Sequence, residues 1–222
     1  MNRTITVRGV GTAKTKPDQV IVSLDLEAKD MDYEKAVFLA DEKIGRLNAA
    51  LTDIGYEEDA LKTVNFNVNT SYTGYHDDKG IYHNVFDGYI VNHSLKLAFD
   101  FSTERLAQTL SAIASCDAKP HLYISFTVKD PTGIKEQLLR SAAENARMKA
   151  ELLTQASGVK LGRLVNIDYN WGEVNITSRT SYAMADEVCE NALPKARAFG
   201  ASMAPEDVSS SDSAAFTWEI ED

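Results

Sequence analysis

The stretch DPTGIKEQLLRSAAENARMKAELLTQASGVKLG, residues 130–162, predicts one long helix with a clear beginning and end. Asp130 can accept hydrogen bonds from the first backbone N–H groups, and Pro131 loses none at the first helical position. Gly158 suits the left-handed residue that ends many helices. The apolar stripe of this helix consists of Ile134, Leu138, Ala142, Ala146, Leu153 and Ala156. Because small alanines occupy its middle, the helix is expected to lie closely on a sheet.

Other segments show either helical spacing or period-two alternation of apolar residues. A medium helix is predicted from Asp32 to Gly55, and a short one from Thr103 to Ser115. Residues 4–28 are predicted as a β-hairpin turning at KTKPD, with Gly9 and Gly11 marking a bulge or a close approach in its first arm. Further strands are predicted at residues 61–75, 85–101, 120–129, 163–176 and 206–220.

Residues 177–205 show no sustained period and are rich in Ser, Ala and Asn, so they are predicted as an irregular, mobile excursion with a turn of helix near residues 184–192. The expected fold is therefore α+β. It has antiparallel sheet with one long and one medium helix packed on a face, a short helix and a long β-hairpin. We expect residues 1–222 to form a single domain, with two intertwined subdomains as the alternative.

The long hairpin is the candidate site. Its turn is predicted at residues 77–80, and its arms are rich in aromatic residues. One interpretation is that these rings cover the sheet, and the other is that they form a contact surface, since aromatic residues are enriched at interfaces. The predicted self-association surface consists of Tyr72, Tyr75, Tyr82 and Phe86.

Charge and hydropathy exclude several classes of partner. The formal net charge of -10 opposes binding to nucleic acid or to an anionic membrane. No apolar run approaches the roughly 20 residues that span a bilayer. The opening MNRTITVRGVG lacks the apolar core of a secretory signal. The expected location is therefore the cytoplasm, with the periplasm or cell envelope as the alternative if a leader has been removed.

No residue pattern indicates catalysis. The sequence has no nucleophile elbow, no Cys–His signature and no phosphate-binding loop, so we predict no enzyme activity, no catalytic residues and no cofactor. His76 and His83 flank Asp77 and Asp78 in the hairpin, which makes a surface metal conceivable. Because the spacing of a strong zinc signal is absent, we predict no metal site and treat these histidines as solvated.

Three motifs resemble those of the SIMPL-domain (DUF541) family. They are the opening ITVRGVGTAKTKPDQVIVSLDL, the return strand Gly88-Tyr89-Ile90-Val91-Asn92, and AAENARMKAELL followed by SGVKLGRLVNI. The closing VSSSDSAAFTWEIED resembles the family's last strand, so the likeness runs from Ile5 to Ile220. The resemblance implies an α+β fold, no established enzymatic activity, and assembly into homo-oligomers of ring- or channel-like form. It also implies links to the cell envelope or to stress responses in some bacterial members.

Two hypotheses about function follow. The first is a non-enzymatic, oligomeric assembly or interaction protein of the SIMPL type. The alternative is a protein that binds a small ligand or a peptide in a groove between sheet and helices. A flat aromatic surface matched by a neighbouring copy would favour the first, and a concave apolar pocket with convergent polar groups would favour the second.

Overall fold

The computed structural model describes residues 3–169, 174–184 and 204–222, which form two compact units. Unit 1 consists of Met1–Asp18, Phe126–Thr180 and Pro205–Asp222, and unit 2 of Gln19–Ser125 and Ser181–Ala204. The predicted α+β class is confirmed, since helices pack on two antiparallel sheets. The single domain, with two intertwined subdomains as the alternative, stays a prediction.

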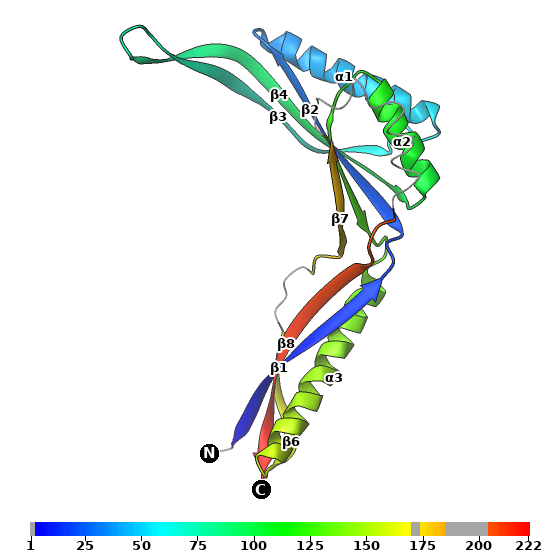
Figure 1. Ribbon diagram of the computed structural model, residues 1–222, viewed down its shortest axis with the longest axis vertical. Coiled ribbons are helices and arrows are strands. Elements are labelled where there is room, and N and C mark those ends of the chain that lie inside the picture. The colour runs from blue at the N-terminus through cyan, green and yellow to red at the C-terminus, as the bar shows by residue number, and fades with distance from the viewer. Residues whose placement is uncertain (1–2, 170–173, 185–203) are drawn as a thin grey trace. The chain divides into compact units, whose positions relative to one another are not determined.

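Unit 1 holds a three-stranded sheet in the order β1 (Thr4–Thr15), β8 (Val208–Glu221), β6 (Lys160–Tyr169). The long helix α3 (Thr132–Ala156) lies along β1 and β8 (Figure 1). One core cluster beneath it consists of Val7, Ala146, Ala150, Ala214, Phe216 and Trp218. The small alanines of the helix thus face large aromatic side chains of β8, as the sequence predicts for a helix lying on a sheet.

The helix approaches β1 most closely at two glycines. A Cβ atom on Gly9 would lie 2.0 Å from the backbone oxygen of Ala142, and one on Gly11 would lie 1.9 Å from that of Leu138. The register between β1 and β8 is unbroken from Thr4 to Thr15, so neither glycine marks a bulge. Of the two predicted roles, close approach is the correct one.

Polar side chains of α3 also bond to the outer edge of β1. The hydrogen bonds run from Val10 N to Asn145 Oδ1 (3.0 Å), from Thr12 N to Ser141 Oγ (3.4 Å) and from Lys149 Nζ to Arg8 O (3.2 Å). Their spacing of four residues keeps all three on one side of the helix. These bonds occupy backbone groups that another strand would need in order to pair with β1.

Unit 2 contains most of a five-stranded sheet in the order β3-β4-β2-β5-β7. The bounds are β2 (Gln19–Asp30), β3 (Leu61–His76), β4 (Tyr82–Asp100), β5 (His121–Thr127) and β7 (Thr177–Met184). Helix α1 (Tyr33–Asp53) packs on β2 and β4, with Ala36 and Ala40 against Ala28 and Val91. Helix α2 (Thr103–Ser115) packs beside α1.

The predicted helix ends are close to those observed. Asp32 caps α1 by accepting from the backbone N–H groups of Glu34 and Lys35, and Ser102 caps α2. The start of α3 is shifted by one residue, because Pro131 takes the N-cap position while Asp130 Oδ1 accepts from Thr132 N. The predicted apolar stripe of α3 was wrong at its C-terminal end. Leu153 is half exposed and Ala156 is also exposed, whereas Thr154 is buried and donates its hydroxyl to the carbonyl of Ala150.

Two predictions about pairing and regularity were wrong. Residues 4–28 do not form a hairpin, because β1 pairs with β8 while β2 pairs with β4 in the other sheet. The segment 177–205 is not irregular throughout, because residues 177–184 form β7. The hydroxyl of Ser178 donates to the carbonyl of Glu206, so a polar side chain of this strand has a hydrogen-bond partner in the backbone. The helical turn expected near residues 184–192 lies outside the described residues. None of the helices described is long and apolar enough to cross a membrane.

We predict that Gly11→Ala lowers the free energy of unfolding by about 1–3 kcal/mol, because the new methyl group meets helix backbone rather than a movable side chain. The matched control is Gly45→Ala on α1, where a Cβ atom meets nothing within 4 Å and helix propensity favours alanine by up to about 1 kcal/mol. Urea unfolding followed by circular dichroism measures both changes. Equal stability of Gly11→Ala and the parent would contradict the close approach.

Candidate interaction surface

The hairpin of β3 and β4 continues past the strand beside it. β2 ends at Asp30, opposite Tyr89, and from the pair Ser71 and Gly88 onward the hairpin is a two-stranded ribbon. We call residues 71–88 the arm, and Figure 1 shows it extending beyond α1 within unit 2. Gly88 has a φ of 106°, and the register shifts between Ser71 and Tyr72. The arm therefore begins at a β-bulge, which turns the ribbon away from the sheet.

Large apolar and aromatic side chains are exposed along the arm. Those at least half exposed are Tyr72, Tyr75, Ile81, Tyr82 and Val85. Singly exposed apolar residues are common on soluble proteins, but several of them along one short ribbon make it a candidate interaction site. This group is the most distinctive surface of the part of unit 2 that the structure describes.

The four predicted contact residues do not share one face. Tyr72 lies opposite Phe86, and Tyr82 lies opposite His76, so these three predicted residues share a face by strand alternation. Tyr75 lies opposite His83 on the other face, with the two rings stacked 5.3 Å apart. The arm therefore presents aromatic rings on both sides, with most on one.

Ring-to-ring contacts connect the arm to helix α1. Edge-to-face pairs join Tyr72 to Phe86 (5.9 Å between ring centroids), Phe86 to Tyr89 (5.3 Å) and Tyr89 to Tyr33 (5.6 Å). Tyr33 is the first residue of α1. Such pairs contribute about 0.5–1.5 kcal/mol each beyond the area they bury. This row of rings holds the base of the arm against the helix. Among the described residues, the outer half of the arm packs only on its own two strands.

Asp77 organises the tip of the arm. Its Oδ1 accepts from the backbone N–H groups of Lys79 and Ile81, both at 2.9 Å, and its Oδ2 lies 2.9 Å from His83 Nε2. These bonds, with the one to His83 first, lower the pKa of the Asp77 carboxyl. His76 lies on the opposite face of the ribbon from His83 and packs against Tyr82, so the structure does not bring the two histidines together as a metal site would require.

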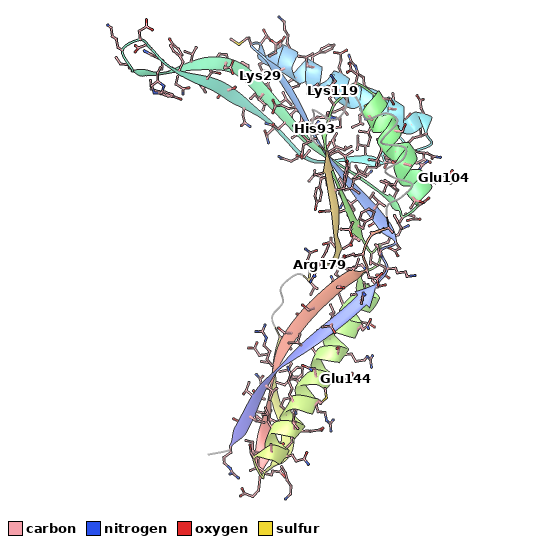
Figure 2. The ribbon with its side chains drawn as sticks, in the orientation of Figure 1. Lys29, His93, Glu104, Lys119, Glu144 and Arg179 are labelled. Atoms are coloured by element: carbon pink, nitrogen blue, oxygen red, sulfur yellow. The ribbon has the colours of Figure 1, made fainter. Side chains whose placement is uncertain are left out.

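An ion pair fixes the base of the arm. Lys29 Nζ on β2 contacts the carboxylate of Asp87 on β4, and Ser71 Oγ lies 3.4 Å from the same carboxylate. The bond from Lys29 is the main cause of the lowered pKa of Asp87. Figure 2 labels Lys29 near the end of β2, where the arm leaves the sheet.

His93 on β4 is a buried polar group that was not predicted as a site residue (Figure 2). Its Nε2 lies 2.7 Å from Thr63 Oγ1, its ring packs edge-to-face on Phe66, and its Nδ1 is buried with no hydrogen-bond partner among the described residues. Burial lowers the pKa of His93. The signal was present in the sequence, because His93 continues the alternation of Tyr89, Val91, Leu95 and Leu97.

Two hollows bear on the ligand-binding alternative. One of about 630 Å³ lies between α1 and α2 and includes the carboxylates of Asp53 and Glu104 in its wall. The other, of about 430 Å³, lies in unit 1 beside the N-terminus of α3 and includes Lys135. The first is a helix–helix groove rather than the predicted groove between sheet and helices. Ligand binding stays a prediction.

The sequence of this chain matches one known protein family. The sequence model of one family, described as "SIMPL: Protein of unknown function (DUF541)", matches residues 5–218. The chain belongs to the SIMPL family. The resemblance seen in the opening, central and closing motifs is thereby confirmed over nearly the whole chain. The family's own description assigns no activity that could be carried over to residues of this chain.

Two curated relatives are similar over part of their length. The 26 kDa periplasmic immunogenic proteins of Brucella melitensis (biotype 1) and of Brucella abortus (strain S19) are each 25% identical to this chain over 166 residues. Each match covers 73% of this chain and 65% of the relative. The chain therefore spans a little under two thirds of the length of these relatives.

We predict that His93 makes stability depend on pH. Because the folded state lowers its pKa below the ordinary 6.5, the unfolded chain binds the proton more readily. The contribution of His93 to the free energy of unfolding is therefore fully present above about pH 6.5, and it falls as the pH drops below that value. Urea unfolding of the parent and of His93→Leu from about pH 5 to pH 8 tests this, because the other histidines are common to both. Parallel pH profiles for the two proteins would contradict it.

Proposed function

We propose that this SIMPL-family chain is a non-enzymatic, self-assembling interaction protein, and that the arm of residues 71–88 forms part of the contact between copies. The observation that carries the proposal is the group of exposed aromatic and apolar side chains on a two-stranded ribbon. A catalytic role forms no part of the proposal, and Asp77, His83 and Asp87 of the arm form bonds that hold its own shape.

The physical argument starts from the weakness of an isolated ribbon. A two-stranded hairpin is at best marginally stable in water, so an arm of this length gains most from packing on something else. Tyrosines suit a surface that is wet in the monomer and buried in the assembly, because the ring is apolar and the hydroxyl stays solvated. A second copy of the chain brings the same rings to the contact and requires no other partner.

Charge sets the conditions for such assembly. Each copy carries a formal net charge of -10, so copies repel one another at low ionic strength. Added salt screens that repulsion, and assembly through an uncharged aromatic surface then tightens. The same charge is why nucleic acid is not proposed as a partner.

The name of the two Brucella relatives places those proteins in the periplasm. By that likeness we propose the periplasm or cell envelope for this chain. The expectation of a cytoplasmic location finds no support in the comparisons. Only the family resemblance supports a ring- or channel-like oligomer and a role in stress. We include both in this proposal.

We predict that replacing Tyr75, Tyr82 and Phe86 with Ser reduces self-association, because the contact loses apolar area on both faces of the arm. The control variant Phe38→Ser/Tyr123→Ser removes exposed rings elsewhere in unit 2 and should assemble like the parent. Size-exclusion chromatography with light scattering, at several salt and protein concentrations, gives the mass of each. A parent that stays monomeric at high concentration would overturn the proposal. A triple variant with the parent's mass would remove the arm from it.

A further inference from the structure

The outer edge of β3 differs from the other sheet edges. β3 is the first strand in the order β3-β4-β2-β5-β7, so one side of its backbone pairs with β4 and the other faces outward. From Thr63 to Tyr75 it contains no charged residue and no proline. This is an unusual run in a chain of which 25% of residues are charged. Monomeric proteins normally protect an exposed edge with charges, prolines or a covering element, because a bare edge is a template for another strand.

The remaining edges described by the structure carry such protection. β1 is covered by α3, whose Asn145 and Ser141 accept from its outward N–H groups. β6 carries Lys160, Arg163 and Asp168, and β7 carries Arg179 (Figure 2). Among the edge strands that the structure describes, an uncharged edge with no described element covering it is thus particular to β3. It is also long, since β3 runs from Leu61 to His76.

The side chains along this edge alternate between amides and apolar groups. Phe66 and Val68 lie opposite His93 and Val91, on the face that carries α1. The other face carries Asn65, Asn67 and Asn69. Asn67 Oδ1 accepts from Asn69 Nδ2 at 2.8 Å and from Asn92 Nδ2 of β4 at 3.2 Å. Val64 and Phe66 remain about half exposed or more.

We propose that the β3 edge pairs with the β3 edge of a second copy in antiparallel register, joining the two five-stranded sheets into one. The inference rests on the proposed self-assembly and names its geometry. A two-fold axis through the joined sheet sets each side chain opposite one from the same face. Amides therefore meet amides, which both donate and accept hydrogen bonds, and Phe66 and Val68 meet their own kind.

The identity of the partner follows from charge. Two copies with a formal net charge of -10 each repel one another at long range, and a neutral surface on both copies adds no local repulsion at the contact. The stretch from Thr63 to Tyr75 meets that condition on both sides of a homotypic pair. A pairing of β3 with β6 would instead set Lys160 and Asp168 against uncharged partners at a sheet edge.

The test is the variant Asn65→Lys/Asn69→Lys, which sets like charges across the proposed two-fold axis at exposed positions. Lysine is chosen because it lowers the net negative charge, so a purely long-range effect would strengthen association rather than weaken it. The expected result is a dissociation constant raised at least about tenfold, the effect of like charges brought together at an interface. The control Gln137→Lys/Gln155→Lys makes the same charge change at exposed positions of α3, outside both the arm and β3, and should assemble like the parent.

Hydrogen exchange locates the pairing. In the parent, backbone amides between residues 63 and 75 should exchange more slowly at concentrations where the protein is associated than where it is monomeric, and in the β3 lysine variant this difference should disappear. A parent that never associates overturns both this inference and the proposed function. A parent that associates without slower exchange in β3, or with new protection in β6, overturns the β3–β3 pairing alone. So does a β3 lysine variant with the parent's affinity.

Discussion

The contact between the backbone of α3 and the glycines of β1 determines how unit 1 is built. With no side chains at Gly9 and Gly11, the helix comes close enough for Asn145 and Ser141 to reach the outward N–H groups of the strand. That edge is then unavailable to another strand. β1 can therefore pair only on its other side, where β8 lies, while β2 belongs to the other sheet. The close packing thus leaves β1 a single edge for strand pairing.

The sequence was most informative where a single element carries its own signals. Both ends of α2, the start of α1 beside Asp32 and the turn at residues 77–80 are set by local chemistry and were predicted closely. Pairing between strands was not, because alternation shows which face of a strand is buried but not which strand lies beside it. β7 was missed for a related reason. Its serines and threonines bond to backbone groups, so a strand there has the composition of a loop.

The candidate site was predicted in composition and only partly in geometry. Aromatic residues indicated the arm, but the prediction grouped them without applying strand alternation, which places Tyr75, three residues after Tyr72, on the other face. The bulge opposite Ser71 and Tyr72, which sets the cross-strand partners, was not announced by any local pattern. His93 shows the opposite case. Its position in the alternation predicted burial, yet a lone histidine among apolar residues invites no attention until its unpaired Nδ1 is seen. The uncharged run in β3 was likewise visible but had no meaning before the strand was known to be an edge.

The interleaving of the two units has a consequence for the order of events during synthesis. β8 comes later in the chain than every other element and is the central strand of its sheet, with β1 on one side and β6 on the other. A ribosome delivers most of unit 2 early, whereas β1 and α3 must wait for β8 before their sheet can close. The apolar face of α3 in a nascent chain therefore lacks Phe216 and Trp218 as packing partners until β8 has been synthesised.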